Sequence, residues 1–267
     1  MTNAATTEED PILYAVDDGV ATITLNRPHR LNAINLDLLG QLRLTLRRFD
    51  NDAAASVAII TGAGDKAFCA GGDLKEFSEL NMQHAFDFGG DFVSRYPSAT
   101  LWWEVAKPTI AAVNGYALAG GFMIALQADI RIASDTARFA ITEAKIGRAA
   151  PWAVPLLWAL PSSVGLELLL TGSNLDAERA RELGFVNYVV PPDQLLDRAR
   201  AIAQQICANA PLTMEAHKRW FYRAMDVGRL NGFVSAEEYC RSVYESDDCQ
   251  EGQRAFREGR SPNWTGR

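Results

Sequence analysis

The stretch KPTIAAVNGYALAGGFM, residues 107–123, is the part of the sequence around which the rest is organised. Residues 110–113 form a continuous apolar run, which predicts a buried strand. Gly120 and Gly121 then open a small-residue segment that predicts a helix. The first amides of a helix have no carbonyl partner within it and lie at its positive end, so they favour an anion or a developing oxyanion. The stretch therefore predicts half of a site that stabilises negative charge.

A second segment, AFCAGGDLKEF at residues 67–77, has a similar arrangement. Its paired glycines, Gly71 and Gly72, are followed by Asp73 and by a helical pattern, so the segment offers another exposed amide. A lone pair of glycines before a helix more often only permits close packing of the backbone. Two such segments in one chain favour a site built from two main-chain donors.

Together the two segments resemble the crotonase superfamily, the enoyl-CoA hydratase/isomerase family, from about Val16 to the C-terminus. The resemblance implies the α/β crotonase (ClpP/crotonase-like) fold, a spiral of repeated ββα units followed by C-terminal helices that build trimers. Family members place one backbone N–H from each segment around the thioester oxygen of an acyl-CoA, which implies Gly72 and Gly120 as the catalytic donors. Such donors contribute about 3 to 4 kcal/mol each to an enolate-like transition state. The substrate-binding residues implied on the first segment are Ala70, Asp73 and Leu74.

Length and composition bound the class of protein. With 267 residues, 48% of them hydrophobic, the chain can bury a large core. We predict a disordered tail over residues 1–10, a core with the acyl-CoA site over residues 11–194 and a helical subdomain over residues 195–267. The sequence has no apolar run of about eighteen residues, and its polar, acidic start lacks the regions of a secretory signal, so we expect neither a membrane span nor secretion.

Charge and special residues restrict the chemistry further. The four cysteines show neither paired nor metal-ligand spacing, so we interpret them as reduced thiols of a cytoplasmic protein. A net charge of −7 argues against broad nucleic-acid binding but leaves room for a local basic pocket. None of the three histidines lies in a metal-site pattern, so we predict no metal. The resemblance implies no separate cofactor, because coenzyme A is part of the substrate.

Local patterns place the other elements. Residues 12–16 and 20–25 alternate around an Asp-Asp-Gly turn, which predicts a β-hairpin. Further strands are expected at residues 57–61, 128–132, 138–141 and 184–190. Helices are expected at residues 36–50, 81–103, 161–171, 176–183, 195–208, 212–225 and 235–247.

The segment RPHRLNAI, residues 27–34, resembles the family segment that passes over the CoA. A basic residue near its middle approaches a CoA phosphate in that family, and Arg30 is the preferred candidate here, ahead of His29. A solvated turn with ordinary surface charges is the equally weighted alternative.

The segment FAITEAKIG, residues 139–147, resembles the family segment with a catalytic carboxylate and implies that role for Glu143. A carboxylate in a partly desolvated acyl pocket has its pKa raised toward the range useful for proton transfer. Read without its context, Glu143 would be an exposed residue beside Lys145.

Two departures from the family pattern lie close to this segment. Hydratases of the family have a second glutamate on the helix after the oxyanion glycine, and this sequence has Met123 there, which the resemblance places among the substrate-binding residues. A thioether accepts hydrogen bonds only weakly, so Met123 and Glu143 cannot together polarise a water. The loop RAAPWAVP, residues 148–155, replaces a glycine-rich loop, and its Trp152 is either a substrate contact or part of the core. Dienoyl isomerases of the family have a further aspartate where this sequence has Pro151, which argues against a dienoyl isomerase.

The sequence therefore favours an acyl-CoA enzyme with one proton-transferring glutamate and a stabilised thioester enolate, catalysing double-bond isomerisation rather than hydration. The resemblance implies a homotrimer or a hexamer. An acyl-CoA hydrolase or decarboxylase of the same fold remains open, as does a non-catalytic member that binds acyl-CoA or RNA. For RNA, a helix with Arg43, Arg47 and Arg48 could present a basic stripe.

Overall fold

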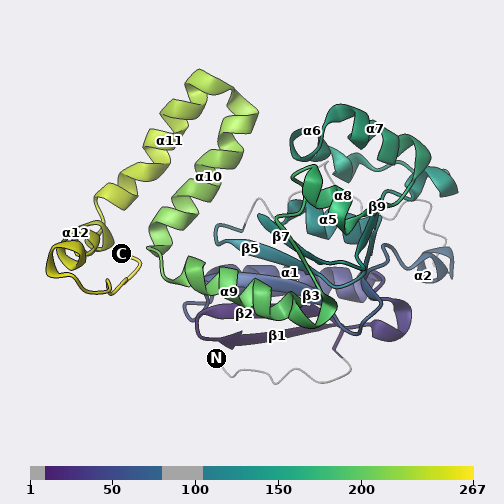
Figure 1. Cartoon of the computed structure of the whole chain (residues 1–267), viewed down its shortest axis with the longest axis horizontal. Coiled ribbons are helices and arrows are strands. Elements are labelled where there is room, and N and C mark those ends of the chain that lie inside the picture. The colour runs from purple at the N-terminus through teal and green to yellow at the C-terminus, as the bar shows by residue number, and fades with distance from the viewer. Residues whose placement is uncertain (1–9, 80–104) are drawn as a thin grey trace.

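The computed structural model describes residues 10–79 and 105–267, which form two β-sheets flanked by helices (Figure 1). In spatial order, the strands of the larger sheet are β1 (Ile12–Asp17), β2 (Val20–Leu25), β3 (Val57–Gly62), β5 (Thr109–Val113), β7 (Ile130–Ser134) and β10 (Tyr188–Val190). Those of the smaller sheet are β4 (Ala67–Cys69), β6 (Tyr116–Leu118), β8 (Arg138–Ala140) and β9 (Leu175–Asp176). Neighbouring strands are parallel except in the antiparallel pairs β1–β2 and β8–β9.

Successive turns of the chain contribute one strand to each sheet. β3 is followed by β4, β5 by β6 and β7 by β8, and in each pair the first strand lies in the larger sheet and the second in the smaller. This arrangement confirms the predicted α/β spiral of two-strand units.

Helices fill the connections and follow the last strand. They are α1 (Leu36–Asn51), α2 (Leu74–Glu79), α5 (Gly120–Gln127), α6 (Leu156–Ala159), α7 (Ser162–Thr171), α8 (Ala177–Glu182), α9 (Leu195–Cys207), α10 (Pro211–Val227), α11 (Arg229–Tyr244) and α12 (Asp247–Glu258). Short 3-10 helices cover Pro28–Arg30, Glu143–Ile146, Pro151–Ala153 and Pro192–Gln194. No described helix is both long and apolar enough to cross a membrane.

Both faces of the larger sheet are covered, so β3 is buried along its whole length. Ala58 and Ile60 belong to the main core, which also contains the apolar face of α1. Val57 and Ile59 pack on the other side against α9, in a second cluster that includes Ala199. The subdomain predicted to begin at residue 195 therefore opens with a helix that packs into the core.

The helices α10 and α11 form a hairpin that projects from the core, with α12 beyond it (Figure 1). Polar contacts fix the base of the hairpin. Asp129 accepts a hydrogen bond from the Tyr222 hydroxyl at 2.9 Å and pairs with the Lys218 ammonium at 2.8 Å. Lys218 also donates to the Lys107 carbonyl at 2.9 Å, so α10 is tied to the chain just before β5.

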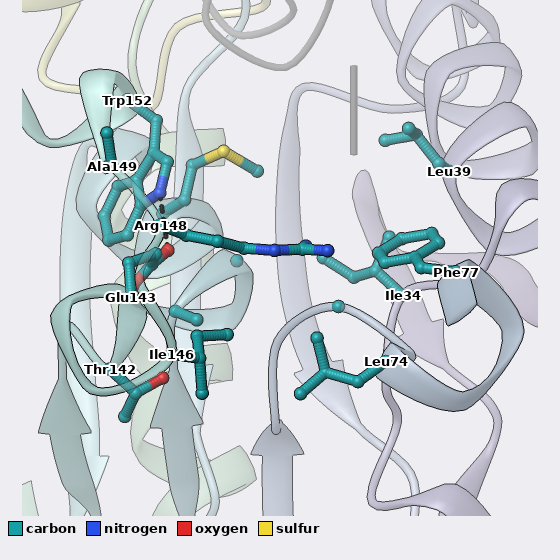
Figure 2. A pocket seen from close by; sticks show the side chains of 14 residues that line it. Ile34, Leu39, Leu74, Phe77, Thr142, Glu143, Ile146, Arg148, Ala149 and Trp152 are labelled. Atoms are coloured by element: carbon teal, nitrogen blue, oxygen red, sulfur yellow. Dashed lines mark hydrogen bonds between the residues drawn. The ribbon is translucent and has the colours of Figure 1, made fainter. Parts of the chain in front are cut away.

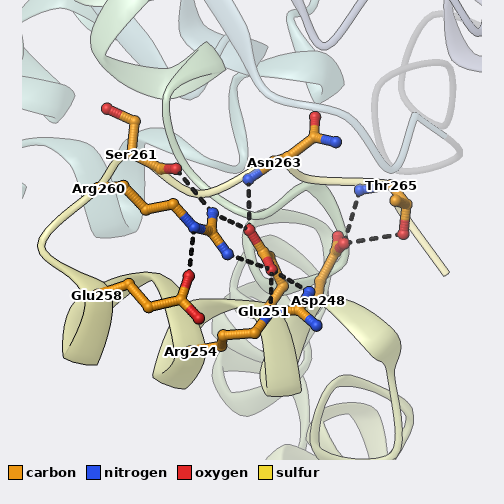
Figure 3. A network of polar contacts seen from close by, with 8 residues as sticks. All are labelled: Asp248, Glu251, Arg254, Glu258, Arg260, Ser261, Asn263 and Thr265. Carbon is orange, nitrogen blue, oxygen red and sulfur yellow. Dashed lines mark hydrogen bonds and ion pairs between the residues drawn. The ribbon is translucent and has the colours of Figure 1, made fainter.

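The C-terminal residues fold back onto α12 through two buried carboxylates (Figure 3). Glu251 pairs with Arg260 and Arg254 and accepts from the Asn263 amide at 2.9 Å, and the two arginines hold the pKa of Glu251 well below its usual range. Asp248 accepts from the amides of Thr265 at 2.6 Å and Gly266 at 2.9 Å. The charges near the C-terminus thus hold the last residues of the chain in place.

Some predicted boundaries are wrong. The strand predicted at residues 184–190 begins only at Tyr188, because Phe185 and Val186 donate to the Ala180 carbonyl in a turn that ends α8. The helix predicted at residues 235–247 begins and ends too late, because α11 already starts at Arg229 and ends at Tyr244. Ser246 then caps a separate helix, α12, by accepting from the Cys249 amide. The predicted helix at residues 81–103, with Trp102 and Trp103, lies outside the described residues, as do residues 1–9 of the predicted tail.

Candidate active site

The two glycine segments meet at the start of α5. A Cβ on Gly71, whose φ is +96°, would lie 2.8 Å from the Ala119 Cβ and 3.4 Å from the Gly120 nitrogen. A Cβ on Gly120 would lie 2.8 Å from Ile34 Cδ1 and 3.7 Å from the Gly71 Cα. Glycine is required at position 71 because its φ is positive and a Cβ there would lie 2.9 Å from the Leu118 carbonyl oxygen. At Gly120 the short contact is only with the end of the Ile34 side chain.

Within residues 10–79 and 105–267, no backbone carbonyl accepts a hydrogen bond from the predicted donor amides. Ile34 forms a parallel bridge with Gly72, made by the Ile34 amide on the Gly71 carbonyl at 2.7 Å and the Asp73 amide on the Ile34 carbonyl at 2.8 Å. The bridge therefore uses the neighbours of Gly72 and not its own N–H group. Gly120 is the first residue of α5, so its amide has no carbonyl partner within the helix. Gly72 and Gly120 line the same cavity.

Ala119, immediately before Gly120, has a backbone conformation that non-glycine residues rarely adopt. Its φ is 48° and its ψ is −117°, and its amide donates to the Ala140 carbonyl at 2.9 Å. Conformations of this kind cost about 1 to 3 kcal/mol and persist only where the surroundings enforce them. The peptide plane after Ala119 carries the Gly120 N–H, so this strained residue sets the direction of that donor.

The cavity has a volume of about 100 Å³ and a mostly apolar wall (Figure 2). Its lining residues are Ile34, Leu39, Gly72, Leu74, Phe77, Ala119, Gly120, Met123, Thr142, Glu143, Ile146, Arg148, Ala149 and Trp152. Among these described residues, Glu143 is the only acid and Arg148 the only cation.

Glu143 lies at the start of the short helix that follows β8 and is 9% exposed. Its Oε1 accepts a hydrogen bond from the Trp152 indole N–H at 2.9 Å, whereas Oε2 is buried without a partner among the described residues. Burial raises the pKa of Glu143, against the opposing effects of its hydrogen bonds and of the nearby Arg148 charge. A carboxylate whose pKa is raised in this way is a stronger base than an exposed glutamate and is therefore better suited to accept a proton.

Met123 lies one turn into α5, three residues after Gly120, and is 5% exposed. Its thioether lines the cavity that Glu143 also lines. Trp152 is 6% exposed, and its ring packs edge-on against Phe122 in the core. It also lines the cavity, where its N–H donates to Glu143, and its predicted contact with substrate stays a prediction. Leu74, predicted to bind substrate, also lines the cavity.

The other predicted substrate-binding residues lie outside the cavity wall. Asp73 forms an ion pair with Arg27 at 3.0 Å. Burial acts to raise the pKa of Asp73, but the hydrogen bond from Arg27 and the positive charge of Arg27 lower it overall. Ala70 donates its amide to the Leu31 carbonyl at 3.0 Å, and Arg30 is exposed on the 3-10 helix Pro28–Arg30. Asp73 and Ala70 therefore fasten the segment 27–34 to the first glycine segment.

Sequence reasoning missed Arg148 and Phe77 as lining residues. Arg148 follows Gly147, whose left-handed conformation, with φ 68°, ends the Glu143 helix. The segment 148–155 departs from the glycine-rich loop of the family, but a single arginine in it gives no signal of which way its side chain points. In the described part of the chain, no group of histidine, cysteine, aspartate or glutamate side chains could hold a metal ion.

Comparison with known proteins agrees with this geometry. Residues 15–267 match the family model described as Enoyl-CoA hydratase/isomerase. The chain is 36% identical over 260 residues to an (E)-benzylidenesuccinyl-CoA hydratase of Thauera aromatica, covering 96% of this chain and 99% of the relative. It is 39% identical over 254 residues to a carnitinyl-CoA dehydratase of Proteus mirabilis, covering 93% of this chain and 95% of the relative.

Solved structures show the same relationship. The enoyl-CoA hydratase of Mycobacterium tuberculosis H37Rv superposes with a TM-score of 0.87 at 39% identity, covering 97% of this chain and 100% of that structure. An enoyl-CoA hydratase/isomerase of Mycobacterium paratuberculosis superposes with a TM-score of 0.89 at 34% identity, covering 97% and 99%. With a family match over nearly its whole length and relatives of this similarity, the chain belongs to the enoyl-CoA hydratase/isomerase family of enzymes.

Proposed function

We propose that this enzyme binds the thioester carbonyl of an acyl-CoA between the amides of Gly72 and Gly120 and uses Glu143 to move a proton along the acyl chain. The observation that carries the proposal is the position of Glu143, the only acid among the described residues lining the cavity, in the wall that Gly72 and Gly120 also line. Its buried Oε2, which has no hydrogen-bond partner among the described residues, is the atom available to a substrate proton.

The chemistry that follows is a double-bond shift. Ionised Glu143 removes a proton from C2 of a 3-enoyl-CoA, and the electrons of that C–H bond pass into an enolate whose oxygen the two amides stabilise. The protonated carboxyl group then returns the proton to C4, and the double bond comes to lie between C2 and C3. One carboxyl group suffices, and no water enters the balance.

Met123 favours this reaction over hydration. Addition of water needs one group to activate the water and another to hold it or to supply the proton, and a thioether is a poor acceptor for that work. Hydration is nevertheless the second candidate, because the relatives from Thauera and Proteus are named a hydratase and a dehydratase.

The test compares a 3-enoyl-CoA with a 2-enoyl-CoA of equal chain length. The proposal expects isomerisation of the first to exceed hydration of the second, and exchange of the C2 proton in deuterium oxide. Glu143→Gln should abolish both isomerisation and exchange, whereas Glu167→Gln, a change at an exposed glutamate on α7, should leave them unchanged. Met123→Glu should increase hydration. Faster hydration than isomerisation by the parent enzyme would overturn the preference, and full activity of Glu143→Gln would overturn the mechanism.

A further inference from the structure

Arg148 is a cation in an otherwise apolar part of the cavity. Figure 2 shows its side chain extending across the pocket from the side of Glu143 and Trp152 toward Phe77. The guanidinium carbon lies 6.0 Å from the centroid of the Phe77 ring. The other side chains around it include Ile34, which also lines the cavity. Arg148 is partly exposed, so its charge is only partly removed from solvent in this position.

No acid among residues 10–79 and 105–267 lies within ion-pair distance of Arg148. The positive charge of Arg148 acts to lower the pKa of the nearby Glu143, but the Glu143 carboxylate accepts its hydrogen bond from Trp152 and not from Arg148. The Arg148 amide, not its side chain, bonds to the Glu143 carbonyl at 2.9 Å. The partly exposed guanidinium of Arg148 therefore lines the cavity with no ion-pair partner among these residues, and its N–H donors are available to a ligand.

The location of Arg148 indicates which part of a ligand it meets. It shares the cavity with Glu143 and with the donor glycines, Gly72 and Gly120, which the proposed function assigns to the thioester carbonyl and the adjacent carbon. A group that reaches Arg148 past these residues belongs to the acyl chain. A planar guanidinium beside an aromatic ring is suited to bind a carboxylate through two parallel hydrogen bonds.

We propose that Arg148 makes the enzyme selective for acyl-CoA thioesters whose acyl chain ends in a second carboxylate a few carbons from the thioester. This inference rests on the proposed function only in placing the acyl chain in this cavity. An uncharged chain of the same length would leave the guanidinium without a partner, and a positively charged chain would be repelled. The apolar wall formed by Leu74 and Phe77 would contact the methylene groups between the two ends.

The experiment measures binding of saturated acyl-CoAs, which the enzyme can neither isomerise nor hydrate. Isothermal titration compares glutaryl-CoA with valeryl-CoA and adipyl-CoA with hexanoyl-CoA, so that the CoA contribution cancels within each pair. A charge-assisted pair of hydrogen bonds predicts that the parent binds the better dicarboxylic ligand about 10- to 100-fold more tightly than its uncharged counterpart. Arg148→Gln should abolish this preference, and Arg148→Lys should retain part of it, because an ammonium group supplies the charge without the planar fork.

Lys145→Gln is the matched control. Lys145 is an exposed cation three residues before Arg148, outside the cavity wall, and its removal should leave the preference of the parent unchanged. Binding of valeryl-CoA by Arg148→Gln shows that this variant has folded. If it does not fold, Arg148→Lys carries the test, and its preference must fall below that of the parent.

Two results would overturn the inference. One is equal binding of both members of each pair by the parent. The other is an equal loss of affinity for both members in Arg148→Gln, which would mean that Arg148 contacts CoA or only supports the cavity. A carboxylate preference without double-bond isomerisation would leave Arg148 as the specificity residue and refute only the proposed reaction. Isomerisation without a preference for the carboxylate would support the proposed reaction and refute the role of Arg148.

Discussion

Replacing Trp152 by phenylalanine tests how the enzyme sets the proton affinity of Glu143. The change removes the indole N–H that donates to Glu143 Oε1 at 2.9 Å and keeps an aromatic ring in the edge-on contact with Phe122, whose ring centroid lies 6.2 Å away. Since Oε2 already lacks a partner among the described residues, the variant leaves the buried carboxylate without a side-chain donor on either oxygen.

The magnitude follows from the energy of that hydrogen bond. A bond to a charged acceptor contributes about 1.5 to 3 kcal/mol, and a pKa change of one unit corresponds to about 1.4 kcal/mol. The bond stabilises the ionised form of Glu143, so its loss adds to the effect of burial, which already raises the pKa of this group. The pKa of Glu143 should rise by about one to two further units.

The measurement is the pH dependence of kcat/KM for isomerisation, or of C2 proton exchange. A general base must be ionised, so the rate rises with pH and levels off above the pKa of Glu143 in the free enzyme. In Trp152→Phe the rising limb should move to higher pH by about one to two units, with most of the rate recovered on the plateau. Trp158→Phe is the control, because Trp158 is 53% exposed and lies outside this cavity. An unshifted limb with a uniformly lower plateau would refute the reasoning, because the indole would then only shape the pocket.

Two further predictions concern stability. Glu143→Gln should raise the free energy of unfolding at about pH 8 and have little effect on it at about pH 4. Burial raises the pKa of Glu143, and such a carboxyl group stabilises the fold below its unfolded pKa but loses that contribution as pH rises through its folded pKa. An equal difference between variant and parent at both pH values, measured by urea unfolding, would contradict this. Asn32→Ala should lower the free energy of unfolding by about 3 kcal/mol, because the fully buried Asn32 side chain accepts a hydrogen bond from the Arg27 backbone amide and donates to the carbonyls of Ala63 and Ala67. Asn32→Gly removes the strain of the positive φ of 56° but also loses these hydrogen bonds, so it should remain less stable than the parent. A loss of stability below about 1 kcal/mol in both variants would contradict this role of the hydrogen bonds.

The sequence predicted best those features that depend on a few neighbouring residues. The first hairpin follows from Asp18 and Gly19, whose φ values of 47° and 76° are those that its short turn needs. By contrast, β6 was not predicted, because it has only three residues and pairs with β4 and β8, which lie far away in the sequence. The strand predicted from Gly184 was partly wrong for a similar reason, since the apolar residues there satisfy the end of α8.

The candidate site shows the same division between local and distant causes. The two glycine segments and the position of Glu143 could be proposed from short motifs, but the burial of Glu143 could not. Its environment depends on Trp152, nine residues later, and on Met123, which α5 brings into the same cavity. Arg148 was missed because its residue type is usually exposed and because its direction depends on the turn at Gly147.

Several unfavourable features meet around this one cavity, and their coincidence is itself an argument for function. Ala119 has a strained backbone, Glu143 has a buried oxygen without a partner among the described residues, and Arg148 crosses an apolar wall. The strained backbone and the buried oxygen without a partner each lower stability, whereas the core of the spiral is held by apolar packing and by satisfied groups such as Asn32. Natural proteins break local rules of this kind mainly where a ligand restores the balance. A thioester oxygen would accept a hydrogen bond from the Gly120 amide, which the strained Ala119 orients. A transferable proton would bind to Glu143, and a ligand carboxylate would pair with Arg148.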